Sequence, residues 1–153
     1  MQKGNDGIKT IANWGAEDNC AQYYIDDADF KHSMISIGLS IVGNEKKVAN
    51  GQHDNLIREL GQWIKDIERP VFLRIGYEFD GWDWNFYNKD EYLASWRRIH
   101  SIFEEMKVNN IAFVWQSKGN GSGQDILEEW YPGDNLVDWC GYSYFNNPDQ
   151  EML

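Results

Sequence analysis

One segment combines an arginine, carboxylates and tryptophans closely enough to support chemistry. It runs from Pro70 to Trp84 and reads PVFLRIGYEFDGWDW. The apolar first half behind a proline predicts a buried strand, and the second half is rich in acidic and aromatic side chains. Charged groups are costly to desolvate, so Arg74 and Glu78 indicate that the strand runs out into a polar pocket. A salt-bridged pair that merely fastens the strand end is the alternative.

Strand geometry places Glu78 at the mouth of this predicted pocket. Because side chains alternate along a strand, residues of even and odd number should lie on opposite faces. One face carries Arg74, Gly76 and Glu78, and the other carries Leu73, Ile75 and Tyr77. Glu78 is then the last inward residue before a turn at Asp80 and Gly81. In a parallel sheet, ligands bind at this carboxyl end of the strands.

The remaining elements predict an α/β fold with parallel strands. Hydrophobic patterns predict strands at 34–42, 70–78, 111–117 and 136–145, a helix at 54–68 with Asp54 as its N-cap, and a helix from an Asn88 cap to about Lys107. This alternation is typical of βαβ units. A complete (β/α)8 TIM barrel needs about 250 residues. The 153 residues therefore predict a single domain, 1–153, that is part of such a barrel, and a small doubly wound sheet is the alternative.

Composition points to a neutral ligand. The formal net charge of −11 disfavours nucleic acid and anionic membranes as partners. Eight tryptophans and eight tyrosines, several of them among polar residues, suit a groove for sugars, which present flat C–H faces ringed by hydroxyls. For Trp63, Trp96 and Trp139 we expect core packing instead. Cys20 and Cys140 show no metal-ligand spacing, and we expect free thiols, no metal and no cofactor.

Four motifs stand out along the chain: the segment from Arg74 to Trp82, Tyr131-Pro-Gly-Asp134, the stretch from Val137 to Tyr144, and Gly51-Gln-His-Asp54 at the start of a helix. Together they resemble glycoside hydrolase family 26, the family of β-mannanases and related endo-β-glycanases. The resemblance runs from about residue 34 to 145. It implies a (β/α)8 barrel and retaining hydrolysis, with the acid/base glutamate at the end of the fourth barrel strand. The matching residue is Glu78.

The resemblance also implies a second carboxylate that these residues do not supply. The family's nucleophile ends barrel strand seven, which would lie beyond Leu153, and Tyr144 matches an aromatic residue near that nucleophile. This sequence departs from the family at Tyr77, where a histidine is common, and at Asp80, where an asparagine is frequent. An inverting pair of Glu78 with Asp80 or Asp83 is a weaker alternative.

The remaining candidate residues would bind substrate. Tyr77 could hydrogen-bond a sugar, and Arg74 could orient a carboxylate. Stacking platforms for sugar rings are predicted at Trp82, Trp84 and Trp115, with core packing as the alternative for Trp115. We expect a retaining endo-glycoside hydrolase of β-mannan or a related β-glycan, with a polysaccharide or oligosaccharide as its partner. The alternatives are a non-catalytic saccharide-binding domain and a truncated, inactive fragment. The substrate class favours an extracellular location, although no signal peptide is visible at the N-terminus.

Overall fold

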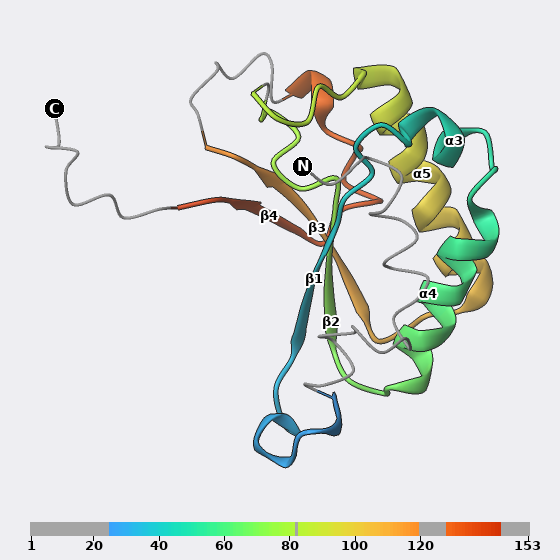
Figure 1. Ribbon diagram of the computed structural model, residues 1–153, viewed down its shortest axis with the longest axis vertical. Helices are drawn as coiled ribbons and strands as arrows, with labels where there is room; N and C mark the ends of the chain where they lie inside the picture. The colour runs from blue at the N-terminus through green and yellow to red at the C-terminus, as the bar shows by residue number, and fades with distance from the viewer. Residues whose placement is uncertain (1–24, 82, 120–127, 145–153) are drawn as a thin grey trace, which may run out of the picture.

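The computed structural model describes residues 25–81, 83–119 and 128–144. Strands and helices alternate along these ranges (Figure 1). Their order is η1 (Ala28–Phe30), β1 (Ile35–Leu39), α3 (Glu45–Ala49), α4 (Asp54–Asp66), β2 (Val71–Ile75), α5 (Lys89–Met106), β3 (Ile111–Ser117) and β4 (Trp139–Tyr142). The four predicted strands and both long helices are confirmed. β3 has the predicted bounds, and the other elements are shorter than predicted. Helix α3 lies in a segment for which the sequence pattern makes no prediction.

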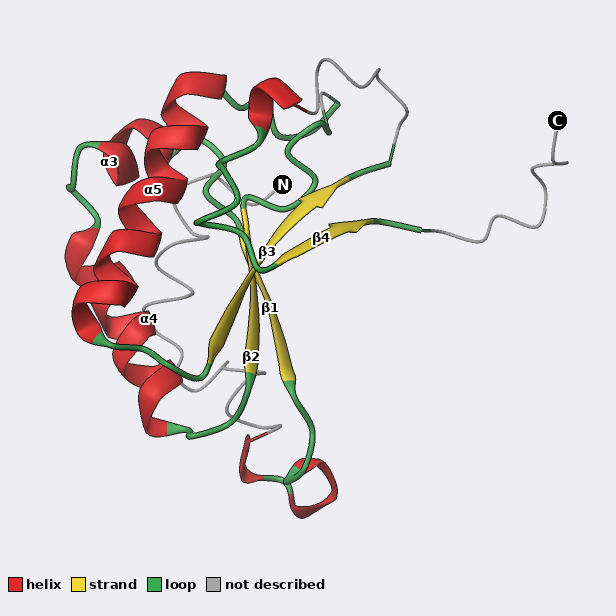
Figure 2. Cartoon of the chain, turned by 180° about the vertical axis from the view of Figure 1, so that it is seen from behind, coloured by secondary structure: helices red, strands yellow, loops and turns green. Residues whose placement is uncertain are grey.

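The four strands form one parallel sheet in the order β1-β2-β3-β4. Val71 lies opposite both Ile35 and Ile111, and Val114 lies opposite Trp139. Figures 1 and 2 show α3, α4 and α5 on the same side of this sheet. A doubly wound sheet has helices on both faces and a reversal in strand order. Neither feature occurs in the described part of the chain, so that alternative is wrong.

The core lies between the sheet and these helices. In β2 the residues facing the helices are almost inaccessible, with Val71 at 1% exposure and Leu73 and Ile75 at 0%. They pack against an apolar stripe that consists of Ile57, Leu60 and Ile64 from α4 and Tyr92, Trp96, Ile99 and Phe103 from α5. The alternate side chains of β2, Phe72 and Arg74, are half-buried on the opposite face. The helix-free face is thus the one that can present polar groups.

The three tryptophans expected in the core differ in their surroundings. Trp96 is fully buried, as predicted, and Trp63 packs at the margin of the core. Trp139 is 60% exposed, so its predicted burial is wrong. It lies on β4, the last strand of the described sheet, and its register with Val114 directs it to the helix-free face. There its ring makes an edge contact with Phe72, with 6.2 Å between the ring centroids.

The two predicted helix caps had different outcomes. Asn88 caps α5, because its side chain accepts a hydrogen bond from the backbone N–H of Glu91 at 3.1 Å. Asp54 is the first residue of α4 rather than its cap, so that prediction is wrong. Its carboxylate instead accepts two hydrogen bonds from Arg98 on α5, at 2.6 and 2.5 Å. Within the described ranges, no helix is long and apolar enough to cross a bilayer.

Candidate active site

The backbone changes conformation directly after β2, and this change sets the direction of the site residues. Regular strand geometry ends at Ile75, and both Gly76 and Glu78 have a φ of 53°. The left-handed region costs a residue with a side chain about 1–2 kcal/mol, and such strain is concentrated at functional sites. The Gly76 N–H donates to the carbonyl of Leu39, and the Glu78 N–H donates to the carbonyl of Gln116, both at 2.8 Å. The turn is therefore fixed to both neighbouring strands.

This turn corrects the predicted orientation of Tyr77. Tyr77 is expected on the face opposite Arg74, but the guanidinium carbon of Arg74 lies 5.3 Å from the centroid of the Tyr77 ring. A Cβ atom on Gly38, in β1, would lie 2.9 Å from the same ring. The alternation of side chains holds only for extended backbone, and the positive φ of Gly76 interrupts it. Tyr77 and Arg74 consequently share the helix-free side of the sheet.

The carboxylate of Glu78 is half-buried and bound to a neighbouring strand. Ser143, directly after β4, donates its hydroxyl proton to Glu78 Oε1 over 2.5 Å. Gln116 Nε2 donates to Ser143 Oγ at 2.8 Å, and Arg74 Nη1 donates to Gln116 Oε1 at 3.1 Å. No ion pair among the described residues joins Arg74 to Glu78 directly, so the salt-bridge alternative is wrong. The structure brings these four side chains together from the ends of three adjacent strands.

The sequence reasoning missed Gln116 and Ser143. Val114 and Gln116 alternate on one face of β3, and Trp139, Gly141 and Ser143 do the same in the paired strand. Gln116 and Ser143 are the last residues on these faces, and both are polar. A polar residue at the carboxyl end of a strand in a parallel sheet is the signal that could have identified them.

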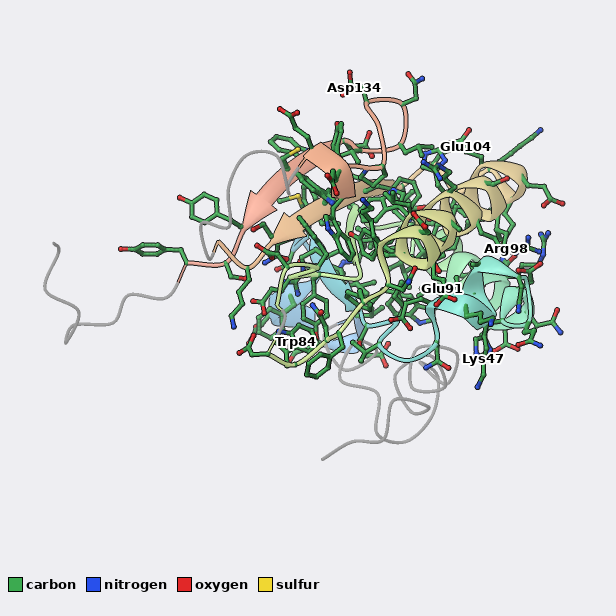
Figure 3. All side chains as sticks on the ribbon, turned by 90° about the horizontal axis from the view of Figure 1, so that it is seen from above. Lys47, Trp84, Glu91, Arg98, Glu104 and Asp134 are labelled. Carbon is green, nitrogen blue, oxygen red and sulfur yellow. The ribbon has the colours of Figure 1, made fainter. Side chains whose placement is uncertain are left out.

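Trp84 forms an aromatic pair with Tyr77, the residue that precedes Glu78. Their ring centroids are 5.7 Å apart, with 34° between the ring planes, and both side chains are half-buried. Figure 3 shows Trp84 well apart from Arg98 and Glu104 on α5. Gly81 allows the close approach of Trp84, because a Cβ atom there would lie 2.3 Å from the indole nitrogen. Trp82, the other predicted platform in this loop, lies outside the described residues.

The other two aromatic candidates have contrasting surroundings. Trp115 is 9% exposed and stacks on Phe79 with 4.7 Å between ring centroids. Tyr131 contacts it edge-on at 5.1 Å, so the packing favours the core alternative for Trp115. Tyr144 is 77% exposed, just beyond the end of β4. Its predicted position near a nucleophile stays a prediction.

The two aspartates after Glu78 are occupied by other contacts. Asp80 is 1% exposed and accepts hydrogen bonds from Ser117 Oγ at 2.7 Å and from the Lys118 N–H at 2.5 Å. Asp83 is exposed and binds Lys118 Nζ at 2.7 and 2.8 Å, and this hydrogen bond lowers the pKa of Asp83. Both carboxylates thus fasten the loop to the end of β3, which argues against an inverting pair.

The described part of the chain offers no cluster of three His, Cys, Asp or Glu side chains that could hold a metal ion. Cys140 is an exposed free thiol, and Cys20 lies outside the described residues. His100 lies on α5 and its ring contacts Phe113 at a tilt, with 4.7 Å between ring centroids and 42° between the ring planes. Among the carboxylates described above, Glu78 is the one that accepts a hydrogen bond from Ser143 on the helix-free side of the sheet.

Comparison with known proteins identifies the family of this fold and site. The model of glycosyl hydrolase family 26 matches residues 7–152. The β-1,3-xylanase TXYA of a Vibrio species is 38% identical over 152 residues, which cover 94% of this chain and 31% of the relative. A β-1,3-xylanase of an Alcaligenes species is 35% identical over 149 residues, which cover 94% of this chain and 30% of the relative. The chain spans about a third of the length of these curated relatives.

Solved structures show the same fold at lower identity. A modular endo-β-1,4-mannanase from Cellulomonas fimi superimposes with a TM-score of 0.64 and 19% identity, over 90% of this chain and 36% of that structure. A β-mannanase from Bacteroides ovatus superimposes with a TM-score of 0.59 and 18% identity, over 92% of this chain and 45% of that structure. These neighbours are TIM barrels, so the singly wound sheet described above is part of a (β/α)8 barrel, as predicted. The chain belongs to glycosyl hydrolase family 26.

Proposed function

We propose that this chain is the acid/base part of a retaining, endo-acting glycoside hydrolase of a β-glycan, with Glu78 as the general acid and base. The observation that carries the proposal is the position of the Glu78 carboxylate. Glu78 follows β2 at its carboxyl end and is half-buried, its carboxylate accepts a hydrogen bond from the Ser143 hydroxyl, and the preceding residue, Tyr77, pairs its ring with Trp84. Active sites of (β/α)8 barrels lie at this end of the strands.

Retaining hydrolysis needs a second carboxylate about 5–5.5 Å from the first. Asp80 and Asp83 are unsuited to that role, because Asp80 is buried against Ser117 and Asp83 is paired with Lys118. We infer that the nucleophile comes from a barrel strand outside the described residues. It would attack the anomeric carbon while Glu78 protonates the leaving oxygen, and Glu78 would then deprotonate the water that releases the sugar.

The relatives favour β-1,3-xylan as the substrate. Both curated relatives with at least 35% identity are named β-1,3-xylanases, and they cover 94% of the chain. The prediction of β-mannan from the family resemblance remains as the second candidate, since the mannanases from Bacteroides ovatus and Cellulomonas fimi are only 18% and 19% identical and support the fold alone. Either sugar could place an apolar ring face on the pair of Tyr77 and Trp84.

The test is the Glu78→Ala variant of the full-length protein, assayed for reducing ends released from β-1,3-xylan, β-mannan and mixed-linkage β-glucan. Loss of acid/base catalysis should lower turnover of the cleaved polysaccharide by about 10²–10⁴-fold. Asp83→Asn is the matched control, because it removes a carboxylate of the same loop that is exposed and bound to Lys118. Proton NMR of the first product should show a β-anomer, as retention requires. Near wild-type turnover by Glu78→Ala would remove Glu78 from the mechanism.

A non-catalytic saccharide-binding domain is the competing function, because the ring pair of Tyr77 and Trp84 could hold a sugar without any chemistry. Calorimetric titration with xylo- and manno-oligosaccharides separates the two. Binding with no reducing sugar released, even at high protein concentration, would favour the binding domain over the hydrolase.

A further inference from the structure

The hydrogen bonds behind Glu78 form one continuous chain with a fixed direction. It begins at the guanidinium of Arg74, passes through the Gln116 amide and the Ser143 hydroxyl, and ends at Glu78 Oε1. Gln116 is only 8% exposed, and the other three side chains are half-buried, so water competes little for these bonds.

The donor-only chemistry of arginine sets that direction. A guanidinium has five N–H donors and no acceptor, so the Gln116 atom facing Arg74 must be the carbonyl oxygen Oε1. The other end of the amide, Nε2, is then a donor toward Ser143 Oγ. The serine oxygen accepts that bond, and its own proton is left for Glu78 Oε1. In this arrangement Glu78 Oε1 meets a hydrogen-bond donor.

We propose that Ser143 is a positioning residue that keeps Glu78 Oε1 as a hydrogen-bond acceptor, so that Oε2 is the oxygen that carries and transfers the proton. This inference rests on the proposed acid/base role of Glu78. A carboxylic acid has one O–H group. A proton on Oε1 would displace the serine proton, for which the described contacts of Ser143 offer no other acceptor, so the neutral acid keeps this bond only with its proton on Oε2.

The strength of the hydrogen bond from Ser143 depends on the charge of Glu78, which changes in both steps of a retaining reaction. In the first, the Oε2–H bond breaks, the proton joins the leaving oxygen as its bond to the anomeric carbon breaks, and Glu78 becomes a carboxylate. In the second, Oε2 takes a proton from the attacking water and becomes an acid again. The bond from Ser143 to Oε1 is charge-assisted only in the carboxylate form, so it strengthens as the proton leaves.

The backbone of Glu78 is held independently of Ser143. Its N–H donates to the Gln116 carbonyl at 2.8 Å, and its carbonyl accepts a hydrogen bond from Asn85 Nδ2 at 2.5 Å. Loss of the Ser143 hydroxyl should therefore release the carboxyl group while the main chain stays in place.

The test compares two kinds of substrate in the full-length protein. An unactivated oligosaccharide needs a proton on its leaving group, whereas a dinitrophenyl glycoside of the same sugar does not. Ser143→Ala should lower kcat/KM for the oligosaccharide by about ten-fold, the effect of losing one hydrogen bond to a charged group, and change it for the dinitrophenyl glycoside by less than about two-fold. Ser143→Thr keeps a hydroxyl and should restore most of the loss.

Ser117→Ala is the matched control, because Ser117 also donates to a carboxylate at the end of a strand, but to Asp80. Any loss it causes should be equal for both substrates. An equal loss for both substrates in Ser143→Ala, or no recovery in Ser143→Thr, would overturn the positioning role and leave the function of Glu78 intact. Full activity of Glu78→Gln on the oligosaccharide would instead refute the proposed function.

A spectroscopic measurement needs no turnover. In protein labelled with ¹³C at the glutamate carboxyl groups, the Glu78 resonance is assigned as the one missing from Glu78→Gln. Ser143→Ala should move this resonance at fixed pH, and Ser117→Ala should move it less, because Ser117 donates to Asp80 and not to Glu78. An unmoved resonance in Ser143→Ala would overturn the inference by itself.

Discussion

Asp80 fastens the loop that carries Glu78 to the end of β3, and its removal should have a large effect on stability. The carboxylate is 1% exposed and accepts hydrogen bonds from Ser117 Oγ at 2.7 Å and from the Lys118 N–H at 2.5 Å. Asp80→Ala removes both acceptors and leaves two donors unsatisfied, each at a cost of about 1–3 kcal/mol. We therefore expect the free energy of unfolding to fall by about 3 kcal/mol.

Urea denaturation measures this change. With a slope of roughly 2 kcal/mol per molar urea, the midpoint should fall by about 1.5 M with the slope unchanged. Asp80→Asn keeps an acceptor for the Lys118 N–H, so its urea midpoint should fall by less than half as much as that of Asp80→Ala. Asp83→Ala is the control from the same loop, and it should leave the midpoint unchanged because its ion pair with Lys118 is exposed. A midpoint for Asp80→Ala within error of wild type would show that the backbone bond of Glu78 to Gln116 holds the loop alone.

Three further changes test the core, the turn and a surface ion pair. Leu73→Ala removes a side chain with 0% exposure and should cost about 2–5 kcal/mol in urea denaturation. Gly76→Ala would place a Cβ atom 2.6 Å from the ring of buried Tyr92 at a φ of 53°, so we expect a loss of about 2–4 kcal/mol, measured as a lower Tm. The hydrogen bond from Arg98 lowers the pKa of Asp54 below its ordinary 3.8, so this pair stabilises the fold above that pH and loses its effect as the pH falls through the lowered value. Asp54→Asn should therefore make the stability less dependent on pH in that acidic range.

A specific experimental outcome would contradict each of these three predictions. A loss under about 1 kcal/mol in Leu73→Ala would mean that the core closes over the cavity. Gly43→Ala is the control for Gly76, because Gly43 also has a positive φ, 71°, but nothing lies within 4 Å of the position that a Cβ atom would occupy there. An equal loss in both glycine variants would refute the clash with Tyr92. An acid stability profile that is the same in Asp54→Asn and wild type would show that the pair with Arg98 contributes nothing.

The local elements could be predicted from the sequence because their causes are local. Val71, Leu73 and Ile75 alternate with less buried residues, and Asn88 caps the helix that follows. Apolar periodicity and helix capping involve residues that are close in sequence, so both can be recognised without knowing which elements pack against them. The position of Glu78 at the carboxyl end of a buried strand followed from the same pattern.

The orientation of the site residues depended on contacts that the sequence does not display. Tyr77 joins Arg74 on one face because two residues of the turn adopt a positive φ, held by hydrogen bonds to Leu39 and Gln116 in the neighbouring strands. Trp139 is exposed because its strand lies last in the described sheet.

The sequence by itself determined which segments become strands and helices, and that a glutamate closely follows the second described strand. Only the tertiary structure decided what surrounds that glutamate. Ser143 lies 65 positions from Glu78 in the chain, and the strand register alone brings its hydroxyl to the carboxylate. The physical reason is that strand formation depends on neighbouring residues, whereas an active site depends on which strand ends meet when distant segments pair.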